Sequence, residues 1–278
     1  MRVCFLVLSA CLVLCGQTVR DRAWDVLKVG VADNNPAKRV RAITAISSLG
    51  PATKPVSMLE ASLLDKDPGV RQTAAALLGE MRARRSIAKL RQAIDDDDPA
   101  VSFTAAHSLW EMGDRTGRKL FEEVLLGDRK QGPGLVQGAM RDARARLRNP
   151  SALAMMGVKE ASGALLGPAS LGIDVAQEIM KDKGAPGRTL SVALLSESCD
   201  SQGRDLMEAV LDTDRNWGVR VAAARALGRC GNAATVTRLE ALLADPHDDV
   251  RMMAAASIVR LTGAKTRPVR AKAPDAHR

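Results

Sequence analysis

Two groups of side chains in this sequence have the chemistry of a reactive site, and the first is a pair of thiols. Cys199 and Cys230 are the two cysteines that lie beyond residue 15. A thiol acts as a nucleophile when a base beside it takes up its proton. Cys230 takes a position at which similar segments of the chain carry Met or Leu, and this predicts a small packed core residue rather than a nucleophile.

The second group joins a histidine to several carboxylates. His247 lies within Asp245–Asp249, and another acidic run covers Asp95–Asp98. Either run could attract a cation, but Asp95–Asp98 lacks the spaced oxygen ligands and the glycine of a calcium loop. Acidic side chains at a helix start are favoured by the helix dipole. We therefore expect both runs to begin helices, and we predict no metal site and no cofactor.

These residues belong to segments that repeat along the chain. A block recurs around Val70, Val101, Val219 and Val250, with a weaker copy around Val40 and a further copy around Gly187. Each of the four stronger copies has an aspartate five residues before the valine, and Asn35 takes that place in the copy at Val40. Self-similarity at a fixed period of about 31 residues is typical of repeat architectures.

The pattern inside each block is helical. Small residues follow the valine at four and five positions, and larger apolar residues follow at eight and eleven, which marks one face of a helix. Second amphipathic stretches such as Val56–Leu64 and Val236–Leu243 lie between the blocks. Each repeat is therefore predicted to be a pair of helices, and six or seven pairs are expected to stack into a curved solenoid.

The composition favours the same architecture. Aromatic residues make up 2% of the chain and apolar residues 46%, so the core must consist mostly of Ala, Leu, Val, Ile and Met. Such a core suits closely packed helices rather than a sandwich or a barrel. Cys199 and Cys230 fall near equivalent places in successive repeats. Because packed helices lie about 8–10 Å apart, beyond the reach of a disulfide, we expect no bridge between them.

The segment Asp65–Arg71, followed by Ala74, Ala75, Leu78 and Gly79, resembles the short HEAT-like repeat of the phycobilisome lyase type. The resemblance covers roughly residues 33–261 and implies an all-α fold, a right-handed α-α superhelix of the HEAT or armadillo kind. It also implies that loop aspartates and helix arginines join adjacent repeats, as a carboxylate and a guanidinium can. This structural ladder would comprise Asp65, Asp96, Asp214, Asp245, Arg41, Arg71, Arg188, Arg220 and Arg251.

The resemblance also raises the question of catalysis, since its family includes bilin lyases and a di-iron hydroxylase. The hydroxylase resemblance would require paired His-Glu steps, and His107, His247 and His277 are not followed by Glu. We predict that the protein is not an enzyme. A lyase-type enzyme or a cofactor-handling protein remains the alternative.

The ends of the chain indicate export. Residues 1–18 have the form of a signal peptide, with Arg2 before an apolar stretch, 3–14, that is too short to span a bilayer. Cys11 and Cys15 lie at positions that resemble lipoprotein processing sites. We expect a bacterial protein that is periplasmic or secreted, with a lipid-anchored, membrane-associated subunit of an envelope complex as the alternative.

The solenoid is predicted to cover residues 19–261, with an irregular repeat around 149–187. Within it, the uncharged segment 161–173 is interpreted as a buried loop, with an exposed loop that touches lipid or a partner as the alternative. Residues 262–278 are expected to form a flexible basic tail. The net charge is +9, but much of it lies in this tail and the remainder is spread along the chain, so a nucleic-acid partner is not predicted.

A non-catalytic scaffold that binds another protein is the leading hypothesis. We expect the partner along the concave face of the solenoid, lined by the second helix of each pair. Large apolar side chains are common at interface centres, although in an alanine-rich core they can also fill gaps. The candidate partner contacts are Phe103, Trp110, Trp217, Met252 and Met253.

Overall fold

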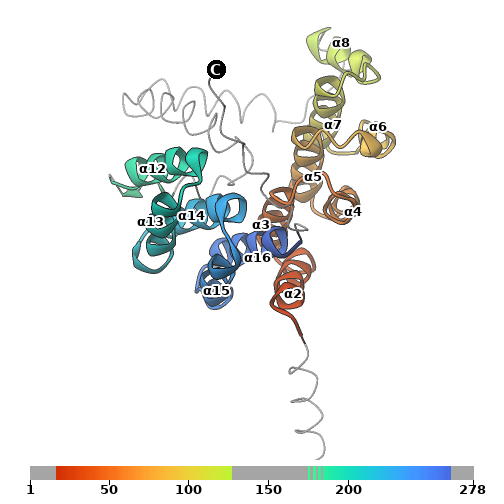
Figure 1. Ribbon diagram of the computed structural model, residues 1–278. Helices are drawn as coiled ribbons and strands as arrows, with labels where there is room; N and C mark the ends of the chain where they lie inside the picture. Colours follow the sequence, from red (N-terminus) through yellow and green to blue (C-terminus); the bar gives the residue numbers. More distant parts are fainter. Residues whose placement is uncertain (1–16, 127–174, 176–177, 180, 183, 264–278) are drawn as a thin grey trace, which may run out of the picture.

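The computed structural model describes residues 17–126, 175, 178–179, 181–182 and 184–263 (Figure 1). The leader up to residue 16, the segment 161–173, most of the irregular repeat and the tail from residue 264 lie outside these residues. Within them the regular secondary structure is helical, without a strand, and the predicted all-α solenoid is confirmed.

The helices follow one another as antiparallel pairs. The N-terminal half contains α2 (Val19–Val31), α3 (Pro36–Ser47), α4 (Thr53–Ser62), α5 (Pro68–Glu80), α6 (Ile87–Ala93), α7 (Pro99–Glu111) and α8 (Arg118–Leu126). The C-terminal half contains α12 (Ala185–Ser198), α13 (Ser201–Thr213), α14 (Trp217–Cys230), α15 (Ala233–Ala241) and α16 (Asp248–Gly263). Short 3-10 turns precede α6 and follow α15, at Arg84–Ser86 and Leu242–Ala244.

The helix starts are set by polar caps followed by proline. The side chains of Asn35, Asp67 and Asp98 accept hydrogen bonds from backbone N–H groups in the first turns of α3, α5 and α7. Proline follows each of these caps, at a position where a missing N–H costs nothing. The acidic runs of the sequence thus begin helices: Asp95–Asp98 precedes α7, and Asp248 and Asp249 lie in the first turn of α16.

The order of the pairs in space differs from their order along the chain. Helix α16, the last one that the structure describes, packs against α2 and α3 from the other end of the chain. Helix α2 therefore acts as the second helix of the pair that α16 begins. Figure 1 shows the resulting stack, which runs α12–α13, α14–α15, α16–α2, α3–α4, α5–α6 and α7–α8.

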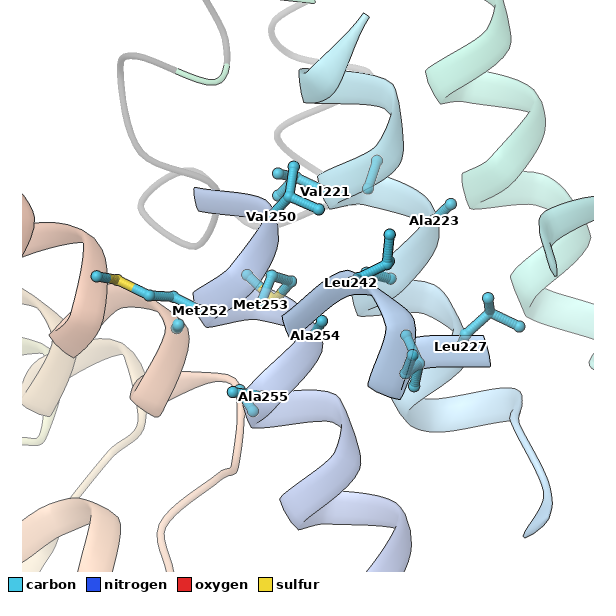
Figure 2. Packing of buried hydrophobic residues seen from close by; sticks show 14 of the residues in the cluster. Val221, Ala223, Leu227, Leu242, Val250, Met252, Met253, Ala254 and Ala255 are labelled. Carbon is cyan, nitrogen blue, oxygen red and sulfur yellow. The ribbon is translucent and has the colours of Figure 1, made fainter. Parts of the chain in front are cut away.

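The seam between α16 and the N-terminal helices has its own apolar core. Met252 of α16 points toward the N-terminal helices (Figure 2), and a methyl group on Gly30 of α2 would lie 2.7 Å from its Cε atom. Trp24 and Leu27 belong to the same buried cluster as α14 and α16. This cluster therefore joins α2 and α3 to the C-terminal half, and a second cluster fills the stack from α3 to α7.

The stack is curved, and its two layers differ. The first helices of the pairs pack directly against one another in a row, whereas the second helices make little mutual contact. Figure 1 shows the first helices on the inner side of an arc and the second helices on its outer side. The inner, concave side is thus formed by first helices, and the expectation that second helices line it is wrong: tighter packing of one layer puts that layer inside the curve.

The closest helix contacts are made where a glycine faces a serine. A methyl group on Gly79 of α5 would lie 2.6 Å from Ser108 Cβ of α7, and one on Gly228 of α14 would lie 2.9 Å from Ser257 Cβ of α16. Each serine hydroxyl donates to a carbonyl of the facing helix, 3.0 Å to Ala75 for Ser108. The same glycine–serine contact thus recurs in both halves of the chain.

Candidate functional site

The loop aspartates and helix arginines join successive repeats. Arg71 donates to the Asp96 carboxylate at 2.7 and 2.8 Å and to the backbone carbonyl of Asp65 in its own repeat at 2.8 Å. Arg220 repeats this arrangement with Asp245, at 3.0 Å, and with the carbonyl of Asp214, at 2.9 Å. Each arginine thus clamps its own loop to the next one.

Arg188 makes a similar clamp in the first described repeat of the C-terminal half. Its guanidinium donates to Asp182 and to Asp214, each at 2.6 Å. These side chains are engaged with one another in the folded protein. They are therefore part of the solenoid's framework rather than free groups for chemistry.

In the first repeat Arg39 occupies the ladder position, and the prediction that placed Arg41 there is wrong. Arg39 donates to Asp65 at 2.6 and 2.8 Å and to the carbonyl of Asp33 at 2.9 Å. The repeat is in register with Pro36 and Pro68, the N1 residues of α3 and α5, so the copy is displaced by two residues from the alignment on Val40.

The seam replaces the regular ladder with other ion pairs. Arg41 pairs with Asp249 of α16 at 3.1 Å, and Lys38 lies 3.6 Å from Asp248. Arg251 donates to the carbonyl of Asp245 and to the Asp248 side chain of its own helix. The last helix is thus joined to the first repeat through its N-terminal turn.

Ladder contacts lower the pKa of two carboxylates, Asp65 and Asp96. Burial raises the pKa of Asp65, but hydrogen bonds from Arg39 and from the backbone N–H of Asp67 outweigh this and hold the pKa below its ordinary value. The pKa of Asp96 is lowered in the same way, burial being outweighed by Arg71 and by the N–H of Asp98. Both carboxylates are therefore stabilised in their charged form.

Of the candidate partner contacts, two are excluded by burial. Met252 and Met253 are 5% and 3% exposed and fill the core around α16. Their large size near a repeat helix reflects the need to fill the seam with α2, so their assignment as contacts is wrong.

The aromatic candidates have mixed positions. Trp110, at the end of α7, is 40% exposed, and the Arg115 guanidinium lies 3.7 Å from its ring centre. Phe103 is partly buried and packs edge-on against Phe121, with ring centres 5.3 Å apart. Trp217, partly buried, stacks on His247 at 5.5 Å. Trp110 is thus the most accessible of the five.

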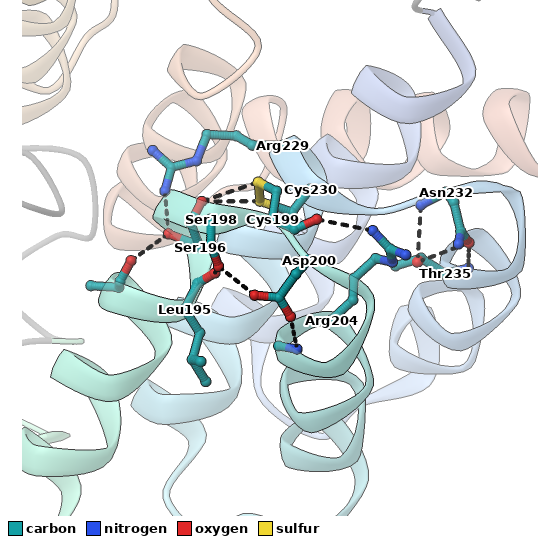
Figure 3. The surroundings of a disulfide bond; sticks show 12 residues. Leu195, Ser196, Ser198, Cys199, Asp200, Arg204, Arg229, Cys230, Asn232 and Thr235 are labelled. Atoms are coloured by element: carbon teal, nitrogen blue, oxygen red, sulfur yellow. Dashed lines mark hydrogen bonds between the residues drawn. A yellow bond between two sulfur atoms is a disulfide. The ribbon is translucent and has the colours of Figure 1, made fainter. Parts of the chain in front are cut away.

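The two body cysteines form a disulfide, contrary to the sequence-based expectation (Figure 3). Their Cα atoms are 5.1 Å apart. The expected spacing holds for the middle of packed helices, whereas Cys199 lies just beyond α12 in a left-handed conformation, with φ 51°. This turn carries Cys199 toward Cys230, the last residue of α14.

A cluster of arginines near this disulfide was missed in the sequence. Arg225 and Arg229 lie one turn apart on α14, and Arg260 lies in the last turn of α16. We call these three residues the arginine cluster. The sequence did contain a signal for this cluster: Arg229 and Arg260 lie 31 positions apart, which is one repeat period.

Two further features concern metal and membrane. Across the described ranges, no three His, Cys, Asp or Glu side chains gather in a group able to hold a metal ion. None of the described helices has the length and apolar character needed to cross a bilayer.

Comparison with known proteins gives matches at the level of a repeat family. A family model for HEAT repeats matches residues 23–110, 56–155 and 173–269. No curated protein matches the sequence. The chain is similar to the structure of human deoxyhypusine hydroxylase in complex with glycerol, at 17% identity, a TM-score of 0.33, and coverage of 88% of this chain and 97% of that one. It is also similar to an engineered protein, at 15% identity, a TM-score of 0.27, and coverage of 86% and 97%.

Proposed function

We propose that this chain, which belongs to the HEAT repeat family, is an exported, non-catalytic scaffold that binds another protein along the inner side of its arc. The observation that carries the proposal is the continuous stack of helix pairs whose first helices form that side. Solenoids of this kind present extended concave surfaces that suit binding to other macromolecules. The finer assignment to the phycobilisome lyase type of repeat stays a prediction.

The disulfide supports export. Disulfides form and persist in oxidising compartments and are rare in a reducing cytoplasm. The bridge between Cys199 and Cys230 fixes the turn after α12 to the end of α14. An exported protein can keep this bond without continuous reoxidation.

The use of charged side chains supports a scaffold rather than an enzyme. Ladder residues such as Arg71 and Asp96 are satisfied by one another across the repeats. A catalytic acid or base must instead reach a substrate. These charged groups therefore hold successive repeats together.

Position-specific photocrosslinking in the native cell envelope tests the proposal. A photoreactive amino acid is placed at exposed positions of first helices, His107 and Glu197, and at exposed positions of second helices, Ser57 and Thr237. We expect one defined protein adduct from the first-helix positions and none from the second-helix positions. Absence of a reproducible adduct from every position, or adducts from second helices alone, would overturn the proposal.

A further inference from the structure

Three arginines on the first helices form no ion pair among the residues that the structure describes. Ladder arginines such as Arg71 and Arg220 each pair with an aspartate within 3.0 Å. In the part of the chain that the structure describes, Arg225, Arg229 and Arg260 form no ion pair. The arginine cluster thus lacks the aspartate partners that the ladder arginines have.

The members of the cluster are held in place by neutral groups. Arg229 donates to the Ser196 hydroxyl of α12 at 3.1 Å (Figure 3), and Arg260 donates to the carbonyl of Ser48, the C-cap of α3, at 2.7 Å. The Nη1 atom of Arg225 is buried and has no hydrogen-bond partner. The cluster therefore keeps N–H groups that are not neutralised by the protein.

The guanidinium of Arg225 is surrounded by charges from its own and other helices. Burial, together with the positive charges of Arg229 and Arg260, lowers the pKa of Arg225 to about 10, whereas the negative charge of Glu80 acts in the opposite direction. Glu80 ends α5, and in the stack α16 and α3 lie between α14 and α5. Arg225, Arg229 and Arg260 all lie on first helices of the stack, α14 and α16.

The helix dipole does not account for the whole cluster. A basic side chain in the last turn of a helix is favoured by the dipole, and this explains Arg229 and Arg260. Arg225 lies in the middle of α14, where the dipole gives no such advantage. Burying a charge without a counter-ion is costly, and such groups mark functional sites more often than chance.

We propose that Arg225, Arg229 and Arg260 bind the carboxylate side chains of an acidic segment in the partner protein. The inference rests on the proposed scaffold function and specifies its partner chemistry. Guanidinium groups donate in a planar fork that matches carboxylates, and they do so most strongly where water is partly excluded. The residues around the cluster on α14 and α16 are mainly small and apolar. The carboxylates of the partner segment would therefore be the counter-ions of these three arginines.

Titration with an acidic peptide tests this directly. The full mature chain, with its disulfide intact, is titrated against a fluorescein-labelled octaglutamate peptide by fluorescence anisotropy, and inorganic phosphate is the competitor. We expect saturable binding that weakens as salt is raised. Binding that phosphate abolishes at concentrations equal to those of the peptide's glutamates would overturn the assignment to a protein segment.

Variants assign the binding to the cluster. Arg225→Met combined with Arg229→Gln and Arg260→Gln should weaken peptide binding at least tenfold. The control carries Arg20→Gln, Lys66→Gln and Arg215→Gln, three exposed positions with the same loss of charge. Equal affinity of the two triple variants would overturn the inference, because net charge alone would then explain binding. Circular dichroism of both variants verifies that they are folded.

Crosslinking with the cluster variant separates this inference from the proposed function. If the unmodified cluster and the triple variant give the same partner adduct with the same yield, the scaffold function stands and the role of the cluster falls. If the unmodified protein gives no adduct, the scaffold function falls whatever the peptide titration shows. Loss of the adduct in the cluster variant alone, with the control unaffected, supports both.

Discussion

The glycine–serine contact between α5 and α7 allows a sharp test of how the repeats are held together. A methyl group on Gly79 would lie 2.6 Å from Ser108 Cβ and 3.1 Å from its Cα, which is backbone and cannot turn away. Gly79→Ala must therefore push the two helices apart. It also stretches the buried hydrogen bond from Ser108 to the carbonyl of Ala75.

The magnitude follows from three opposing effects. Overpacking a well-packed core costs about 1–3 kcal/mol, and weakening a buried hydrogen bond costs about 1 kcal/mol or more. Replacing a helical glycine by alanine stabilises the helix by about 1 kcal/mol. We expect Gly79→Ala to lower the free energy of unfolding by about 2 kcal/mol, measured by urea denaturation with circular dichroism.

A matched control is available in α12. Gly187 is helical, and a methyl group there meets nothing within 4 Å. Gly187→Ala should therefore raise the free energy of unfolding by about 0.5–1 kcal/mol. If Gly79→Ala is as stabilising as Gly187→Ala, close approach at this contact is not what joins the repeats.

A double variant tests the same contact from the other side. Ser108→Gly removes the Cβ atom that the new methyl group would meet, although it also removes the hydroxyl. The double variant Gly79→Ala with Ser108→Gly should be more stable than the sum of the two single changes by about 1 kcal/mol. Strict additivity of the single effects would refute a direct clash.

Three further predictions concern the disulfide, the ladder and the arginine cluster. Replacing both Cys199 and Cys230, 31 positions apart, by Ser should lower the free energy of unfolding by about 3–4 kcal/mol, because the bridge restricts the unfolded chain; an unchanged melting curve with and without reductant would contradict this. Asp65→Asn should destabilise the protein by about 3 kcal/mol at pH 7, since it leaves Arg39 buried without its carboxylate. The pKa of Asp65 is lower in the folded state than in the unfolded state. The difference in stability between the unmodified protein and the variant should therefore be complete above the unfolded-state pKa of about 3.9 and should vanish as the pH falls through the folded-state pKa. Urea titrations from pH 7 to pH 2 would measure this difference. Arg225→Met should raise the free energy of unfolding by about 1 kcal/mol, because it removes a poorly compensated buried charge; destabilisation by a similar amount would show that the charge is compensated.

Local periodicity was sufficient to predict the fold class. Apolar spacing, caps and prolines act within a few residues of one another, so the alternating helices and their assembly into a solenoid followed from the sequence, whereas the order of the pairs in the stack did not. The register of the first repeat was not predicted correctly, because Val40 lies two residues beyond the position that corresponds to Val70. Its capping residue Asn35 and Pro36, which fix the helix start, were the better guide.

Features that depend on distant residues or on backbone conformation were not predictable in this way. Nothing in the sequence near α2 shows that its partner is α16, since Gly30 and the Met252 side chain that it faces come from opposite ends of the described chain. The disulfide depends on a left-handed backbone at Cys199, a conformation that non-glycine residues rarely adopt. The arginine cluster appears only once the repeats are stacked and the inner side of the arc is known.

The pairing of α2 with α16 bears on when the protein can become native. A chain synthesised or exported from its N-terminus delivers α2 first and α16 last, and contacts between such distant segments form slowly. Until α16 arrives, the apolar side chains of Trp24 and Leu27 lack the layer that covers them in the finished protein. Folding is therefore complete only when α16 is present, and until then the intermediate exposes an uncovered helix face.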